Sequence, residues 1–224
     1  MKKTTSSLHT SRSRLLVGSL LLAGSVAAQA QLFNPSFEEP VHPNNPHIGS
    51  WKAFWSDASS FAGNSGELPR SGAASLILSN SGQADSFAGA FQEVQGLQAG
   101  VEYNLSGWHA TTVANTGVAF EIRIEWRDSV SDTEISRTPS LIPTVFGEYT
   151  PFSLTSEAPV GADAARIVLV IQSFVPGDTH FGSFHVDDVA FAAVPEPGTY
   201  AMVAAAGLIG FALFRRRNGE ARSE

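Results

Sequence analysis

The chain has 224 residues, a formal net charge of −7, 43% hydrophobic residues and no cysteine. Without cysteine it has no disulfide, no thiol nucleophile and no cysteine-ligated metal. Residues 31–194 carry 6 lysines and arginines against 18 acidic residues, which argues against binding to nucleic acid or to anionic lipid headgroups. The acidic balance is compatible with divalent cations and with neutral glycans.

The first 30 residues are predicted to be a secretory signal peptide. Residues 15–23 are a short apolar run, and Ala28-Gln29-Ala30 is a small-residue cleavage site. The positive charges that precede the apolar run are Lys2, Lys3, Arg12 and Arg14. We therefore expect the general secretion machinery to export the chain and signal peptidase to cleave it after Ala30. An uncleaved N-terminal anchor is the alternative.

Residues 41–66 are predicted to be mostly loop, because prolines and glycines punctuate them. This segment carries Trp51, Phe54, Trp55 and Phe61. Flat aromatic side chains on a loop either pack against an edge of the fold or form a platform for a ligand such as a sugar ring. Trp51 and Trp55 are therefore candidate glycan contacts, with packing as the alternative for both.

The clearest strand is predicted over residues 118–127, where apolar side chains occupy every second position. The positions between them hold Glu121, Arg123, Glu125 and Arg127, which we interpret as a solvent-exposed surface of salt bridges. Residues 165–172 are apolar on both faces, and this pattern predicts a central strand that is covered on both sides. Further strands are predicted over residues 74–78, 87–94, 101–110, 149–154 and 184–191.

Glycine- and asparagine-rich turns separate these runs, and no segment of the domain shows sustained helical periodicity. Seven to nine short strands with regular turns predict an all-β fold, a β-sandwich. On the predicted strand 101–110, Trp108 shares a polar face with Glu102 and Asn104. Trp108 is a third candidate glycan contact, and packing within the fold is again the alternative.

Two motifs mark the ends of this domain, LFNPSFE at residues 32–38 and FHVDDVAF at residues 184–191. The pair resembles the first and last strands of galactose-binding-like jelly rolls, a class that includes carbohydrate-binding modules. The resemblance implies a jelly-roll β-sandwich over residues 31–193. It also implies a structural Ca²⁺ between the first and last strands, for which Glu38, Asp187 and Asp188 are the candidate ligands. Alternation places Asp187 and Asp188 on opposite faces of the strand and leaves open which of them binds. Carboxylates that accept hydrogen bonds without an ion are the alternative.

Catalytic motifs are missing from the sequence. It contains no histidine pair at metalloprotease spacing, no Gly-x-Ser-x-Gly elbow and no phosphate-binding loop. We therefore expect a non-catalytic protein with no catalytic residue, which interacts with exopolysaccharide or another glycan. The alternatives are an exported carbohydrate-active hydrolase on the same sandwich and a structural surface protein without a ligand.

The last part of the chain, residues 194–224, contains three features in a fixed order. Pro195-Glu196-Pro197 is followed by the uncharged residues 198–214, a predicted transmembrane helix, and then by Arg215, Arg216 and Arg217 on its cytoplasmic side. This order resembles the PEP-CTERM sorting signal. The resemblance implies recognition by an exosortase, a membrane protease, with an inner-membrane intermediate and then delivery to the cell surface or extracellular matrix. A plain C-terminal anchor is the alternative.

Overall fold

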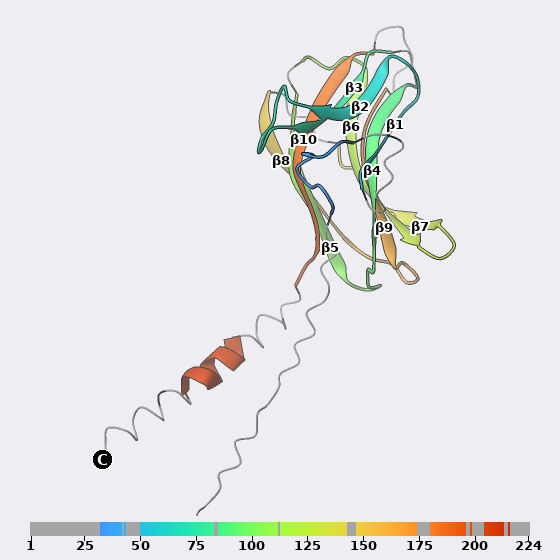
Figure 1. The fold of residues 1–224 in the computed structure, drawn as a ribbon. Helices are drawn as coiled ribbons and strands as arrows, with labels where there is room; N and C mark the ends of the chain where they lie inside the picture. Colours follow the sequence, from blue (N-terminus) through green and yellow to red (C-terminus); the bar gives the residue numbers. More distant parts are fainter. Residues whose placement is uncertain are drawn as a thin grey trace, which may run out of the picture.

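Two antiparallel five-stranded sheets pack face to face in the computed structural model (Figure 1). The structure describes residues 32–41, 43, 50–82, 85–111, 113–142, 147–173, 180–195, 198, 204–212 and 215. The first sheet contains, in spatial order, β1 (Lys52–Trp55), β4 (Phe87–Gln95), β9 (Ala164–Ser173), β6 (Val118–Asp128) and β7 (Thr133–Arg137). The second sheet contains β2 (Ser60–Ser65), β3 (Ser75–Asn80), β10 (Gly182–Ala193), β5 (Glu102–Thr111) and β8 (Gly147–Glu157). The predicted all-β sandwich is confirmed.

The seven predicted strands are confirmed as β3, β4, β5, β6, β8, β9 and β10. In β6 the apolar positions Phe120, Ile122, Ile124 and Trp126 point into the core and are at most 2% exposed. β9 is the central strand of its sheet, as its doubly apolar sequence predicted, and it pairs with β4 and β6. The period-two pattern therefore identified the strands that have a large buried face.

The prediction that residues 41–66 are mostly loop is wrong over β1 and β2. Both are edge strands, and pairing with β4 and β3 stabilises them despite their irregular sequence. Gly63 in β2 lies beneath the ring of Phe61, where a Cβ atom would approach the ring to 2.7 Å. β7 was not expected at all, because its five residues are all exposed and show no apolar alternation.

Aromatic side chains join the inner faces of the two sheets. Phe120 of β6 in the first sheet stacks on Phe184 of β10 in the second, with ring centroids 5.0 Å apart. Within the second sheet, Tyr103 of β5 stacks on Phe191 of β10 at 5.3 Å. Trp126 packs against the Tyr103 ring at 5.9 Å. Burying side chains of this size stabilises the folded state by about 1.5–3 kcal/mol each. This core fixes the two outer faces on which functional side chains stand.

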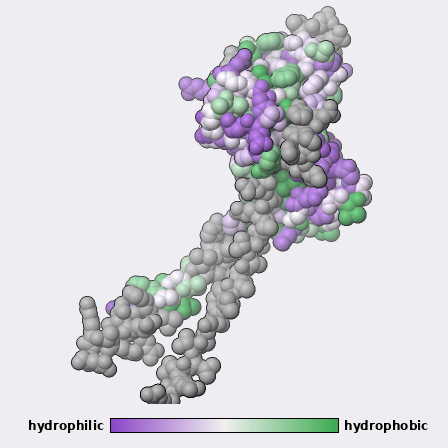
Figure 2. Space-filling model, viewed as in Figure 1, coloured by the Kyte–Doolittle hydropathy of each residue, from purple (hydrophilic) through white to green (hydrophobic). Residues whose placement is uncertain are grey.

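The sorting-signal region begins directly at the end of β10. Ala193 pairs with Tyr103, and the backbone N–H of Val194 donates to the carbonyl of Glu102 at 2.8 Å. Residues 198, 204–212 and 215 are helical. The stretch 204–212 is drawn red in Figure 1 and is mostly green, that is hydrophobic, in Figure 2. In the described part of the chain, no helix is long and apolar enough to cross a membrane.

Several predicted features lie outside the described residues. These are the signal peptide, Glu196 and Pro197 of the sorting motif, Arg216, Arg217 and part of the predicted transmembrane helix. Pro195 and Arg215 are described, but the residues between and around them are described only in part.

Candidate functional site

The outer face of the first sheet carries three neighbouring phenylalanines. Phe54 of β1 lies 6.0 Å, between ring centroids, from both Phe87 and Phe91 of β4. β4 turns the small Ala88 and Ala90 toward the core, where both are fully buried, so its larger apolar side chains face outward. An aromatic surface therefore covers the β1–β4 half of this face.

A row of alternating charge crosses the other half of the same face. Glu93, Arg166, Glu125 and Arg137 are register partners on β4, β9, β6 and β7. Arg166 Nη2 lies 2.5 Å from Glu93 Oε1, and its Nη1 lies 4.0 Å from Glu125 Oε2. Arg137 Nη1 lies 3.9 Å from the other oxygen of Glu125. Opposite charges on directly paired residues stabilise a sheet, so this row belongs to the fold as well as to the surface.

Glu125 is the centre of this network. Arg123 Nε donates to Glu125 Oε1 at 2.9 Å, and Arg123 Nη1 donates to Glu121 at 3.2 Å. The predicted salt bridges are therefore confirmed, but the predicted exposure is wrong, because Glu121, Glu125 and Arg127 are only 8%, 5% and 8% exposed. Long side chains from the neighbouring strands cover these charges. Charges that are this buried require partners, and each of them has one.

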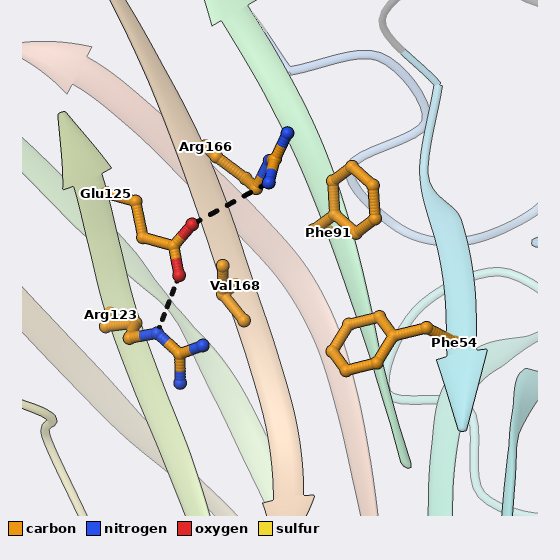
Figure 3. Close-up of a pocket in the computed structure, with 6 residues that line it drawn as sticks. All are labelled: Phe54, Phe91, Arg123, Glu125, Arg166 and Val168. Atoms are coloured by element: carbon orange, nitrogen blue, oxygen red, sulfur yellow. Dashed lines mark hydrogen bonds and ion pairs between the residues drawn. The ribbon is translucent and has the colours of Figure 1, made fainter. Parts of the chain in front are cut away.

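A depression of about 210 Å³ lies where the aromatic and charged halves meet. Its lining is Phe54, Phe91, Val168, Arg123, Glu125 and Arg166. In Figure 3 the two phenyl rings stand on one side, the charged groups stand on the other, and Val168 lies between them. The guanidinium carbon of Arg166 lies 4.7 Å from the Phe91 ring centroid and so joins the two halves.

This arrangement offers flat apolar faces beside fixed hydrogen-bond donors and an acceptor. Such a combination suits a ligand with one apolar and one hydroxyl-rich side. A smaller depression of about 100 Å³ lies beyond the Glu93–Arg166 pair on the same sheet, and its lining in the described residues contains no aromatic side chain. Phe91 and Arg166 were not predicted from the sequence to contact a ligand. The alternation of Phe87, Gly89 and Phe91 was the signal that marked a second apolar face.

The outer face of the second sheet differs because residues 66–74 cover it. Asp187 of β10 is fully buried and accepts backbone N–H groups from Arg70 at 2.8 Å, Ser71 at 3.1 Å and Asp188 at 2.7 Å. Burial raises the pKa of Asp187, and these three N–H donors oppose that shift. The Tyr149 hydroxyl donates to a carbonyl of the covering segment at 2.6 Å, and burial raises the pKa of Tyr149 to about 12.

The prediction that Asp187 and Asp188 point to opposite faces is wrong. The strand register shifts after Asp187, and Asp188 adopts a positive φ of 49°. A bulge of this kind redirects a side chain. Both carboxylates consequently bind the same covering segment, Asp188 through the Ser71 hydroxyl at 2.6 Å and through the Arg70 guanidinium.

Glu38, the third predicted calcium ligand, also binds the covering segment. It accepts the N–H groups of Ala73 at 3.0 Å and Ala74 at 3.2 Å. Gly72, which directly precedes Ala73, has φ +62°, and a Cβ there would come within 2.2 Å of the Glu38 carboxylate. Across the described residues, no group of three or more His, Cys, Asp or Glu side chains is placed to hold a metal ion. Calcium binding by Glu38, Asp187 and Asp188 stays a prediction.

The three candidate tryptophans have different environments. Trp51 is fully buried, and its indole N–H donates to the Asn34 carbonyl at 3.1 Å, so it cannot stack on a ligand as predicted. Trp108 lies on the outer face of β5, but the guanidinium of Arg70 sits 3.8 Å from its ring centroid. Trp55 is 39% exposed and lies beside the exposed Phe61. Of the three, Trp55 has the accessible ring.

One sequence family matches the chain. Residues 193–217 match the PEP-CTERM protein-sorting motif, which covers the end of β10 and the tail. No curated protein sequence matches the chain. The predicted sorting signal is therefore confirmed, and it implies export, a membrane-anchored intermediate and exosortase processing.

Solved structures share the fold of the domain. The tandem CBM22-1–CBM22-2 domain of Paenibacillus barcinonensis Xyn10C is 14% identical with a TM-score of 0.52, and the match covers 77% of this chain and 48% of that one. The single CBM22-1 xylan-binding domain of the same protein is 14% identical with a TM-score of 0.50, covering 77% and 99%. The enzymatically active domain of bacteriophage CBA120 tailspike protein 4 is 16% identical with a TM-score of 0.49, and the match covers 67% of this chain and 20% of that one. The fold is thus a β-sandwich like that of carbohydrate-binding modules.

Proposed function

We propose that residues 31–193 form a non-catalytic glycan-binding domain, which exosortase processing delivers to the cell surface or extracellular matrix. The observation that carries the proposal is the depression on the first sheet, where the Phe54 and Phe91 rings face Arg123, Glu125 and Arg166. The C–H face of a pyranose ring stacks on the phenyl rings. Its hydroxyl groups bond to the guanidinium groups and to the carboxylate.

The charge distribution favours a neutral glycan. Of the six lysines and arginines in residues 31–194, five stand on the first sheet: Lys52, Arg123, Arg127, Arg137 and Arg166. The four arginines pair there with Glu93, Glu121, Glu125, Asp132 and Glu134. The face is therefore nearly balanced in charge, while the remainder of the domain is acidic and repels polyanions. A neutral exopolysaccharide fits both conditions.

The composition of the depression supports binding over hydrolysis. A glycosidase uses two carboxylates on either side of the scissile bond. Among the described residues that line the depression, Glu125 is the one carboxylate, and Arg123 holds it at 2.9 Å. A xylan-binding domain among the solved structures shares the sandwich, which is consistent with a binding role for the fold.

A glycan array probed with residues 31–194, which contain both sheets, tests the proposal. We expect binding to neutral polysaccharides and at least a tenfold loss of affinity in Phe91→Ala and Arg166→Ala. Phe181→Ala is the matched control, because Phe181 is an equally large side chain, 47% exposed and outside the depression. Silence across the array, or equal affinity of Phe91→Ala and the unaltered domain, contradicts the proposal.

A further inference from the structure

The sorting signal joins the folded domain without a linker. β10 ends at Ala193, and the next N–H, that of Val194, donates to the Glu102 carbonyl at 2.8 Å. The match to the sorting motif begins at residue 193, which is still in β10. Residues 195–197 span at most about 11 Å even when fully extended. A membrane protease that binds them is therefore brought against the end of the sandwich from which the tail leaves.

The strand register shows which loops share this end. β5 begins beside the end of β10, and β8 ends beside the start of β5. The short connection of residues 158–163 leads from there into β9, and β6 ends beside the start of β9. The β6–β7 turn, residues 129–132, and the β8–β9 loop, residues 158–163, therefore stand at the tail end of the sandwich, the lower end in Figure 1.

Three branched apolar side chains are exposed on these loops and on the adjoining strand. Val130 in the β6–β7 turn is 91% exposed, and Val160 in the β8–β9 loop is 92% exposed. Ile135 of β7 is 40% exposed and stands beside Gly161, where a Cβ atom would lie 3.7 Å from the isoleucine Cδ1. We call Val130, Ile135 and Val160 the tail-end patch. Valines this exposed contribute nothing to the core, so the patch is available to a partner.

Hydrogen bonds fasten the loops of the patch to one another. The N–H and the hydroxyl of Ser129 both donate to the Asp163 carboxylate at 2.7 Å, and the N–H of Leu97 donates to the Asp163 carbonyl at 2.9 Å. The Asp128 carboxylate accepts the N–H of Val130 itself at 2.8 Å. A patch held in this way loses little conformational entropy when a partner covers it.

The charge around the patch favours a protein partner over a lipid surface. Residues 128–135 and 158–163 contain four carboxylates and no lysine, arginine or aromatic residue. The arginines on either side of the first segment are already paired with carboxylates within it. Membrane-binding segments use basic side chains for anionic headgroups and Trp or Tyr for the interface. The sorting motif brings one protein to this place, the exosortase.

We infer that the tail-end patch is a docking surface for the exosortase, which holds the folded domain while residues 195–197 enter the protease. This inference rests on the exosortase processing within the proposed function and is independent of glycan binding. Contact with Val130 and Val160 keeps the motif at the protease for longer than three motif residues would alone. The patch thus sets the rate of processing.

Pulse–chase processing of the full chain, in cells that contain the exosortase, tests the inference. The double variant Val130→Ser/Val160→Ser is expected to be processed about tenfold more slowly, since burying a valine side chain against a partner is worth about one power of ten in affinity. Phe181→Ser is the control, because Phe181 is 47% exposed and precedes the start of β10, at the opposite end of the sandwich. Equal rates for the double variant and the unaltered chain would overturn the inference.

A flexible spacer gives a second, independent variant. About eight Gly and Ser residues inserted between Val194 and Pro195 uncouple docking of the domain from binding of the motif. With the spacer, the unaltered patch and the double variant should both be processed at the slow rate. If the spacer instead speeds the processing of the unaltered chain, the domain obstructs the protease and the inference is wrong.

Photo-crosslinking in the full chain identifies what covers the patch. Benzoylphenylalanine in place of Val160 is expected to form an adduct with an epitope-tagged exosortase, and in place of Phe181 to form none. An adduct with lipid alone, or with a second copy of this chain, would overturn the inference. Glycan affinity of the double variant should equal that of the unaltered domain, so a silent glycan array contradicts the proposed binding function and leaves the docking result standing.

Discussion

The two outer faces of the sandwich contain similar side chains, but a segment of the chain covers these side chains on one face and leaves them open on the other. On the second sheet, residues 66–74 cover Asp187 and Asp188, and Arg70 lies over the ring of Trp108. On the first sheet, arginines and carboxylates pair with one another, and the rings beside them remain open. The difference indicates that aromatic side chains stay accessible to a ligand only where the chain does not use the neighbouring charges to hold its own segments.

Asp187→Ala is expected to have the largest effect, because Asp187 holds the segment that covers the outer face of the second sheet. The substitution leaves the N–H groups of Arg70, Ser71 and Asp188 without their acceptor, which costs about 3 kcal/mol of unfolding free energy. Urea denaturation measures the loss. Asp187→Asn keeps an acceptor oxygen and should lose less, so equal losses for the two variants would show that the three hydrogen bonds are not the cause.

Glu125→Gln tests the open outer face of the first sheet. The neutral amide keeps an acceptor oxygen but removes the charge that Arg123, Arg137 and Arg166 share. Because these arginines are partly exposed, we expect a loss of about 1–2 kcal/mol in unfolding free energy. The face also becomes more positive. Binding to an acidic polysaccharide such as polygalacturonate, which the unaltered domain should not bind, is expected to appear and to weaken with salt. If acidic and neutral glycans bind this variant as they bind the original, charge balance does not set the specificity.

His109→Leu tests a polar side chain that is buried in the core between the two sheets. His109 lies between Phe120 and Phe152, and burial lowers its pKa. Among the residues that the structure describes, its buried Nδ1 has no hydrogen-bond partner. Removing that atom is expected to stabilise the domain by about 1 kcal/mol at neutral pH.

The same substitution changes the pH dependence of stability. In the unfolded chain a histidine takes up its proton near pH 6.5, whereas the buried ring resists it, so unfolding free energy falls as the pH drops below about 6.5. Burial also lowers the pKa of His185, which adds to this loss. Thermal melts between pH 7.5 and 5 should show a shallower loss for His109→Leu. If the melting temperatures of His109→Leu and the unaltered domain fell equally with pH, His109 would not be a cause of the acid sensitivity.

Arg70→Ala uncovers Trp108 and sharpens the comparison of the two faces. The Arg70 side chain is one-third exposed, so its contact with the ring and with Asp188 contributes only about 0.5–1 kcal/mol. Glycan affinity should stay the same, because Trp108 lines neither of the two depressions described on the first sheet. A gain in glycan binding would mean that the covering segment conceals a second site.

Calcium is expected to have the smallest effect. An ion held by Glu38, Asp187 and Asp188 must displace the N–H and hydroxyl groups that already donate hydrogen bonds to these carboxylates. We therefore expect weak binding, with a rise in melting temperature of no more than about 2 °C in millimolar Ca²⁺. Calorimetry after EDTA treatment measures it, and absence of heat would remove calcium from consideration.

The sequence predicted the strands with a buried face and missed the features that depend on neighbouring strands. The alternation around Ile122 and Ile124 identified β6, but the burial of Glu125 depends on Arg166 and Arg137, which lie 41 and 12 positions away and meet it only through pairing. Likewise, the pattern at Asp187 and Asp188 predicts plain alternation, and a one-residue bulge changes it. The aromatic surface was missed because alanines, rather than phenylalanines, fill the core side of β4.

The order of the strands has a consequence for how the exported chain folds. β9 and β10, the last two strands along the chain, are the central strands of the two sheets. β9 joins the pairs β1–β4 and β6–β7, and β10 joins the pairs β2–β3 and β5–β8. Until both have emerged from the membrane, four separate strand pairs expose unpaired edges, a condition that favours aggregation. Because the tail follows β10 directly, the two sheets cannot close until nearly the whole chain ahead of the sorting signal has been exported.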